Sequence, residues 1–417
     1  MSSQAEAATA IEGASEPGAR KPSDGKPGAT PPGGWRSRFT GVDPGSAPVL
    51  LGLFAIWAVF ALANERFLSA VNLTNLMLQI AATGTISVGL VLVLLLGEID
   101  LSAGILSGLA AATAAALNVK AGWPGAACAL AGLGVGTLVG AFHGLWVARL
   151  GVPSFVVTLA GLLAWQGVLL LTLGDAGTIN LGDPFLVSIA GTFFDPPLAL
   201  ALGGAAALAY AASVVVGRRR RLAAGLSPEP LAPALVRAGA AIVAIVAAVS
   251  VFALDRGLPL AVLLFLGLLV AVETLLHKTR FGRHIFAVGG NAEAARRAGV
   301  RVRTVRVAAF ALGGLLAAAG GLLAASRLLA VNQSSGGGDV LLNAVAAAVI
   351  GGTSLFGGRG SAWSALLGAL VIGSISNGMD LLALPSSVKF VVTGAVLLLA
   401  ASADAVSRRE TGRGGRR

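Results

Sequence analysis

The side chains in this sequence that could do chemistry are few, and one pair lies between long apolar runs. Glu98 and Asp100 are two residues apart in the segment 97–104, GEIDLSAG. An ionisable residue within a membrane segment is costly and is a functional candidate by default, so these carboxylates could line a polar path or gate. They could also cap the helix expected from Leu101, since a helix N-terminus stabilises negative charge. We favour this structural role at a helix break.

The second chemically distinct place is the basic segment 277–306. It holds eight Lys or Arg and a single acidic residue, Glu293. A segment this polar must lie in water beside the membrane, and we expect a short helix near 292–298 that ends at glycine. Such a helix could transmit a push from a partner protein. The simpler interpretation is that these charges only set the orientation of the chain in the membrane, because cytoplasmic loops are rich in Lys and Arg.

Common catalytic signatures are missing from the sequence. It contains no GxxxxGK[ST] loop for ATP phosphates and no HExxH or CxxC motif. Its serines lack a nucleophile-elbow context. We therefore expect a protein that is not an enzyme and has no cofactor and no metal. His143 and Cys128 lie within apolar runs and are expected to be packed structural residues.

The elements that must position these residues have the length of membrane helices. The chain has 417 residues, of which 56% are hydrophobic and 12% charged, against about 25% charged in a typical soluble protein. A membrane helix needs about 20 mostly apolar residues. We expect an all-α polytopic membrane protein with about 10–12 transmembrane helices, some of them broken or half helices. The candidate spans are 47–63, 73–97, 101–119, 121–148, 150–174, 196–217, 238–254, 257–272, 307–326, 340–358, 360–379 and 390–403.

Charge sets the expected orientation of the chain. The net charge is +11, but the cations flank the spans, which favours topology signals over nucleic-acid binding. With both termini inside, the only ones of the 30 Lys and Arg outside are Arg66, Lys120, Arg256, Arg327 and Lys389. We expect a disordered cytoplasmic tail at 1–46, a transmembrane domain at 47–404 and a basic cytoplasmic tail at 405–417.

Further polar or aromatic groups lie inside the spans. Trp165, Gln166, Asn343 and Asn377 are candidates for a solute path, because sugars are bound by planar hydrogen bonding and aromatic stacking. The segments 97–104 and 351–358 also share a frame of Gly, Leu and Gly, as in transporters built from two repeats with interrupted helices. Chance similarity between glycine-rich segments is the alternative.

Three motifs in order carry a resemblance to a known family: GEIDLSAG (97–104), TRFGRHIFAVGGNAEAARRAGV (279–300) and VIGGTSLFGGRGS (349–361). Together they resemble the permease subunits of bacterial ABC importers for simple sugars, the ribose, xylose and galactose branch, which is related to the branched-chain amino-acid permeases. The resemblance covers about residues 48–404. Segments 148–167 and 177–180 and the hairpin at 196–254 look most like xylose-type permeases.

The resemblance implies a function and partners. It implies import of a monosaccharide, such as D-xylose or a similar pentose or hexose, by alternating access in the bacterial inner membrane. The partners would be a cytoplasmic ABC ATPase that hydrolyses the ATP, a periplasmic or lipoprotein sugar-binding protein, a second permease copy and membrane lipid. The family's ATPase-coupling loop falls on Arg280, Phe281, Gly282, Gly289, Asn291, Glu293, Ala294, Ala295 and Gly299. The chain departs from many relatives at Glu98, where they have Gly, and at Asn343, where they have an acidic residue.

The sequence also allows other classes of function. A secondary transporter driven by an ion gradient would want relays of ionisable residues, yet the spans are nearly bare beyond Glu98 and Asp100, and the basic segment would be unexplained. An ABC permease for another small solute, such as branched-chain amino acids, is a further alternative. A non-transporting scaffold or receptor would not need glycine-rich broken helices.

Overall fold

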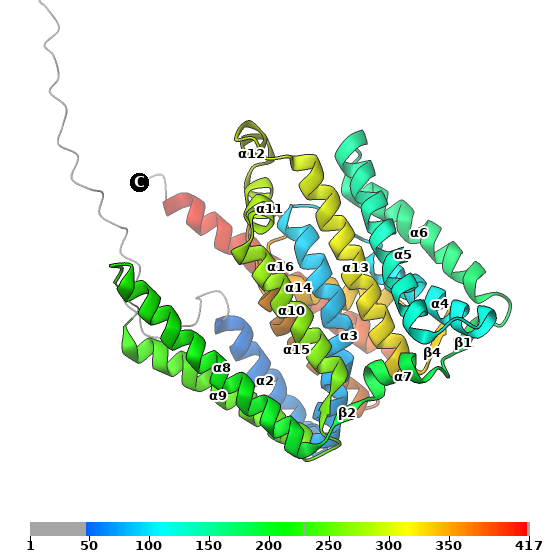
Figure 1. Cartoon of the computed structure of the whole chain (residues 1–417), viewed down its shortest axis with the longest axis horizontal. Helices are drawn as coiled ribbons and strands as arrows, with labels where there is room; N and C mark the ends of the chain where they lie inside the picture. Colours follow the sequence, from blue (N-terminus) through cyan, green and yellow to red (C-terminus); the bar gives the residue numbers. More distant parts are fainter. Residues whose placement is uncertain (1–46, 228–229, 415–417) are drawn as a thin grey trace, which may run out of the picture.

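Long apolar helices make up most of the molecule. The computed structural model describes residues 47–227 and 230–414 (Figure 1). The predicted tail at 1–46 lies outside the described residues, as does the end of the predicted basic tail. Within the described part, nine helices are long and apolar enough to cross a membrane. The prediction of an all-α polytopic membrane protein is thereby confirmed.

The helices follow one another with short connections. They are α2 (Ala47–Ala63), α3 (Ala70–Leu95), α4 (Ala103–Ala121), α5 (Gly125–Leu145), which continues as a π-helical turn (Trp146–Leu150), α6 (Ser154–Leu173), α7 (Pro184–Gly191), α8 (Pro196–Ala223), α9 (Leu231–Ala253), α10 (Leu260–Lys278), α11 (Arg280–Gly290), α12 (Ala292–Arg297), α13 (Val302–Leu328), α14 (Gly338–Ile350), α15 (Ala362–Leu381) and α16 (Ser386–Gly414). Short strands pair antiparallel as β1 (Thr178–Asn180) with β4 (Ala330–Asn332) and β2 (Phe193–Phe194) with β3 (Leu258–Pro259).

Helix α13 lies at the centre and packs against α3, α4 and α5 (Figure 1). Small residues allow these backbones to touch. A methyl group added at Gly136 or Gly140 of α5 would overlap the carbonyl oxygen of Gly314 or Phe310 on α13. Membrane helices associate through such close small-residue contacts because lipid supplies no hydrophobic force between them. This central packing fixes the ends of α3 and α13, where the site is built.

The predicted span at 340–358 is wrong in length, because the helix there stops early. Helix α14 has 13 residues and ends at Ile350. The next residues include Gly352, Gly357 and Gly358, whose φ angles of 105°, 84° and 74° lie in the left-handed region. Only glycine adopts this conformation without strain, so the apolar run breaks into a half helix and an irregular loop at 351–361.

Two other boundaries differ from the sequence prediction. Helix α3 begins at Ala70 rather than near Leu73, because Ser69 caps it by accepting a hydrogen bond from the backbone N–H of Asn72. The segment 175–195, which lies between two predicted spans, contains β1, α7 and β2. Asp183 caps α7, since its Oδ1 accepts hydrogen bonds from Phe185 N and Leu186 N at 2.9 and 3.1 Å.

The hairpin of α8 and α9 lies to one side of the bundle (Figure 1). Helix α8 runs six residues past the predicted span 196–217, so the arginines at 218–221 lie on its last turns. The hairpin joins the bundle through α9 and α3. Most of its apolar side chains are exposed, as at Leu208, which suits a surface that faces lipid.

Candidate functional site

The basic segment 277–306 forms two short helices, α11 and α12, at one end of the bundle (Figure 1). Helix α12 confirms the helix predicted near 292–298, whereas α11 was not predicted. Thr279 caps α11 through a hydrogen bond from Gly282 N to its Oγ1, at 3.2 Å. Asn291 caps α12 in the same way, with its Oδ1 accepting from Ala294 N at 2.9 Å. Each cap satisfies a backbone donor that a helix start leaves unpaired, so Asn291 is the joint between two defined helices.

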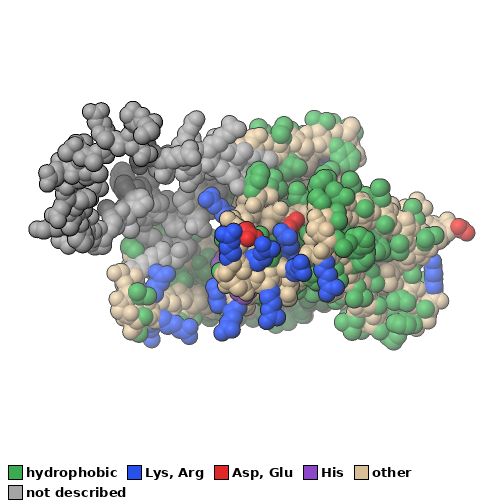
Figure 2. All heavy atoms as spheres, turned by 90° about the horizontal axis from the view of Figure 1, so that it is seen from above, with side chains coloured by type: hydrophobic (Ala, Val, Ile, Leu, Met, Phe, Trp, Pro, Cys, Tyr) green, Lys and Arg blue, Asp and Glu red, His purple; other side chains and the backbone are tan. Residues whose placement is uncertain are grey.

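The outer surface of α12 is charged. Glu293 forms ion pairs with Arg296 at 2.8 Å and Arg297 at 3.2 Å, and all three side chains are exposed. Lys and Arg side chains gather over this end of the molecule in Figure 2. Of the residues that the resemblance assigns to coupling, Gly282 and Ala295 are buried, Phe281 and Gly289 are half-buried, and Arg280, Asn291, Glu293, Ala294 and Gly299 are exposed. The surface is therefore polar and suited to contact with another protein.

Helix α11 packs against the ends of α10 and α3 and against α13. Ile285 and Val288 are buried in the main core. A methyl group at Gly282 would overlap the carbonyl oxygen of Leu276 on α10. One at Gly289 would overlap the carbonyl oxygen of Leu95 at the end of α3. Backbone thus touches backbone on this face of α11, which leaves no flexible side chain in between.

The three motifs recognised in the sequence meet at this point. Gly358 N donates a hydrogen bond of 2.9 Å to the carbonyl oxygen of Leu95. A methyl group at Gly357 would lie 2.8 Å from Gly97 N and 2.9 Å from the carbonyl oxygen of Gly289. We call Gly97, Gly289, Gly357 and Gly358 the glycine junction. It connects α11 to the end of α3 and to the loop before α15, a contact that sequence reasoning did not predict.

An ion pair crosses close to the junction. Glu98 Oε1 lies 3.1 Å from Nε of Arg306 on the first turns of α13, and the two side chains are 13% and 29% exposed. The geometry is that of an ion pair rather than a hydrogen bond, since Arg306 Nε has no hydrogen-bond partner. Glu98 thus connects the loop after α3 to α13.

Glu273 is a second carboxylate at this end, and sequence reasoning missed it. Its Oε2 accepts a hydrogen bond of 2.9 Å from Ala362 N at the start of α15, and its Oε1 lies 3.1 Å from His277 Nδ1. The signal available was an acidic residue four positions before a histidine in a run that is otherwise apolar. Helix α10, which leads into α11, therefore holds the start of α15.

Asp100 belongs to a buried network of hydrogen bonds. Its Oδ1 accepts hydrogen bonds from Ser102 N at 2.8 Å and Ser102 Oγ at 2.6 Å, at the start of α4. Ser102 Oγ lies 3.3 Å from His143 Nδ1, and His143 Nε2 accepts from Trp165 Nε1 at 3.0 Å. Because an indole only donates, Nε2 carries no proton, and His143 is neutral with its proton on Nδ1. This network of hydrogen bonds links the start of α4 to α5 and α6.

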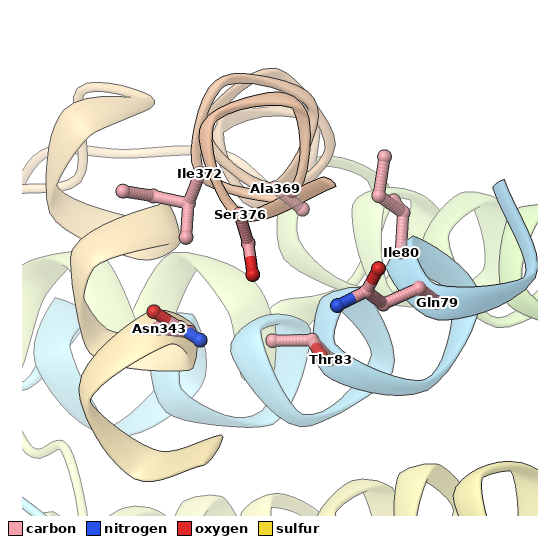
Figure 3. Close-up of a pocket in the computed structure, with 8 residues that line it drawn as sticks. Gln79, Ile80, Thr83, Asn343, Ala369, Ile372 and Ser376 are labelled. Carbon is pink, nitrogen blue, oxygen red and sulfur yellow. The ribbon is translucent and has the colours of Figure 1, made fainter. Parts of the chain in front are cut away.

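The remaining predicted path residues differ in whether their side chains form hydrogen bonds within the protein. Gln166 Nε2 donates to the carbonyl oxygen of Gln333 at 3.2 Å. Asn377 and Asn72 exchange hydrogen bonds of 2.8 and 3.0 Å. Asn343 instead lines a small pocket between α3, α14 and α15, together with three polar residues that were not predicted: Gln79, Thr83 and Ser376 (Figure 3). Two polar residues one turn apart in the apolar run of α3 were the available signal.

Comparison with known proteins identifies the family. The model of the family described as branched-chain amino acid transport system / permease component matches residues 72–401. The chain belongs to this permease family. The permease is 37% identical to the xylose transport system permease protein of Escherichia coli over 368 residues, 88% of this chain and 92% of that protein. The corresponding protein of Haemophilus influenzae is 37% identical over 370 residues, 87% and 96% of the two chains.

A second group of relatives is named for another sugar. The ribose import permease protein of Bacillus subtilis is 30% identical to the permease over 369 residues, 88% of this chain and 95% of that protein. No solved structure matches the chain. The resemblance inferred from the three sequence motifs is confirmed, and the permease is a multi-pass membrane protein.

Among the described residues, no group of three or more His, Cys, Asp or Glu is arranged to hold a metal ion.

Proposed function

We propose that the permease is the membrane subunit of an ATP-driven importer of a monosaccharide, D-xylose or a similar pentose or hexose. The relatives named for xylose and ribose support the substrate class. The observation that carries the proposal is the glycine junction, because it connects an exposed, charged helix pair to two membrane segments through backbone contacts.

In this proposal, an ATPase subunit binds α12 and moves it with respect to the membrane. The caps at Thr279 and Asn291 keep α11 and α12 intact as they move. The junction passes the displacement to the end of α3 and to the loop before α15, and Glu273 passes it from α10 to α15. The ion pair of Glu98 with Arg306 stabilises the helix arrangement in this structure. Coupling then follows from a partner's differential affinity for two arrangements of the helices.

The assembly that we propose has two permease copies, ATPase subunits on the α11–α12 side and a sugar-binding protein on the opposite side. The permease would lie in the bacterial inner membrane, surrounded by lipid. Both termini and the segment 277–306 would be cytoplasmic, which the gathering of Lys and Arg over that end supports (Figure 2).

The test is transport by the complex reconstituted with its ATPase and binding protein in proteoliposomes. We expect uptake of D-xylose or another monosaccharide that requires ATP and persists when an ionophore collapses the proton and sodium gradients. Uptake that survives ATP depletion but stops with the ionophore would instead show a secondary transporter. Uptake of leucine with no sugar uptake would show an amino-acid permease.

A further inference from the structure

Four neutral polar side chains from three helices line one small pocket in the membrane-spanning part. They are Gln79 and Thr83 on α3, Asn343 on α14 and Ser376 on α15. Figure 3 shows the Ser376 hydroxyl pointing from α15 into the space between Asn343 and the α3 residues. Thr83 lies near the middle of the 26-residue helix α3, so the pocket lies about halfway along a membrane span. The rest of the lining is apolar: Ile80, Ala369, Ile372 and Gly373.

Several other polar groups on the same helices are paired within the protein, although Ser87 Oγ of α3 is buried without a hydrogen-bond partner. Thr74 and Thr85 of α3 donate to the carbonyl oxygens of Ala70 and Ala81. Ser374 of α15 accepts a hydrogen bond of 2.9 Å from the indole of Trp57.

In residues 47–227 and 230–414, by contrast, no hydrogen bond reaches the side chains of Gln79, Thr83, Asn343 or Ser376. An unpaired polar group at membrane depth costs several kcal/mol and is tolerated where it meets water or a ligand. The four side chains are half-buried, so the pocket leaves them accessible to water or a ligand, and the described chain provides no partner for them.

The chemistry of the lining selects the class of partner. None of the eight lining residues is ionisable. The two amides and two hydroxyls each donate and accept hydrogen bonds, as does every hydroxyl of a sugar. Ile80 and Ile372 offer apolar surface to the C–H groups of a sugar ring. A zwitterionic amino acid would be bound more strongly by charged partners, which this lining lacks.

We propose that Gln79, Thr83, Asn343 and Ser376 form a subsite that binds the hydroxyls of a neutral monosaccharide as it passes through the membrane. The inference rests on the proposed function and adds to it the residues that discriminate between sugars. The subsite holds the sugar only in passing, because each contact is a single neutral hydrogen bond of modest strength.

The experiment removes hydrogen-bonding groups with little change of shape. The complex with ATPase and binding protein is reconstituted in proteoliposomes with Thr83→Val, Asn343→Leu or Gln79→Leu in the permease. Thr83→Ser is the conservative variant that keeps the hydroxyl. The matched control is Thr137→Val on α5, whose hydroxyl donates to the carbonyl oxygen of Leu133 on its own helix at 2.8 Å.

Two quantities are measured: the maximal uptake rate of each sugar, and the ratio of D-xylose uptake to that of deoxy analogues lacking one hydroxyl. We expect each subsite variant to lower D-xylose uptake about two- to tenfold, the effect of one net hydrogen bond. The ratio should fall toward one for the hydroxyl that the altered side chain contacts. Thr137→Val should stay within about twofold of wild type in both quantities, and Thr83→Ser should recover most of the uptake that Thr83→Val loses.

Three results would overturn the inference, and they are distinguishable. If the wild type transports sugar and the subsite variants match Thr137→Val in both quantities, the pocket does not bind the substrate, although the proposed function stands. If uptake falls only in proportion to permease dimer lost on size-exclusion chromatography, the pocket is a subunit interface. If wild type transports no sugar with ATP, the proposed function and the subsite both fail.

Discussion

Replacing Gly289 with alanine tests the glycine junction most directly. The added methyl group would overlap the carbonyl oxygen of Leu95 and lie 2.7 Å from Gly358 N, both of which are backbone atoms. Relief of the overlap requires α11 to move away from α3, at an overpacking cost of about 1–3 kcal/mol. That movement also strains the 2.9 Å hydrogen bond from Gly358 N to Leu95 O, which contributes about 0.5–1.5 kcal/mol.

The sum is about 1.5–4.5 kcal/mol, and strain of about 2 kcal/mol that falls on one of two conformations shifts their ratio roughly 30-fold. We therefore expect Gly289→Ala to lower the sugar transported per ATP hydrolysed by at least about tenfold. The matched control is Gly290→Ala, since a methyl group there meets nothing within 4 Å. The assay measures uptake and ATP hydrolysis on the same proteoliposomes, with thermal unfolding to verify folding. A folded Gly289→Ala protein that couples as well as Gly290→Ala would refute the reasoning.

Three further contacts make separate predictions. Arg306→Glu should lower uptake by removing the ion pair with Glu98, and the added change Glu98→Arg should recover part of the lost uptake. A double-mutant cycle on uptake should give a coupling energy of about 0.5–1 kcal/mol between the two residues. A coupling energy of zero would contradict the contact. Asn291→Ala should destabilise α12 by about 1 kcal/mol and weaken ATPase binding in a pull-down titration, whereas Asn291→Asp keeps the cap and should bind as wild type. Trp165→Phe should lower the thermal unfolding temperature of the permease, because it removes the hydrogen bond to His143, which contributes about 1 kcal/mol. An unchanged temperature would count against the buried hydrogen-bond network.

Sequence patterns were sufficient for the membrane spans but not for the places where spans break. Apolar composition predicted α13 and α15 within a few residues, because burial in lipid demands it. The same signal overestimated α14, where glycine conformation decides the end of the helix. The composition of a segment indicates whether it lies in lipid or in water. Where a helix ends depends on the backbone conformation of particular glycines, which packing decides.

The candidate site shows the same division. The resemblance assigns a coupling role to residues of 279–299 from local sequence, whereas the contact of Gly289 with Leu95 joins segments far apart in the chain. Among the path candidates, Trp165 and Asn377 are satisfied by hydrogen bonds within the protein, whereas Asn343 lines the pocket. Sequence alone cannot separate these cases, because a polar residue in a span looks the same with or without a partner.

The glycine junction has a consequence for engineering. Its contacts involve main-chain atoms and hydrogens in place of side chains, and main-chain atoms are identical in every protein. The outer face of α12 could therefore be exchanged for that of a relative without rebuilding the surface beneath α11. The exposed positions between Asn291 and Gly299 could then be replaced, with the buried Ala295 kept, so that one membrane domain could be adapted to a different ATPase subunit.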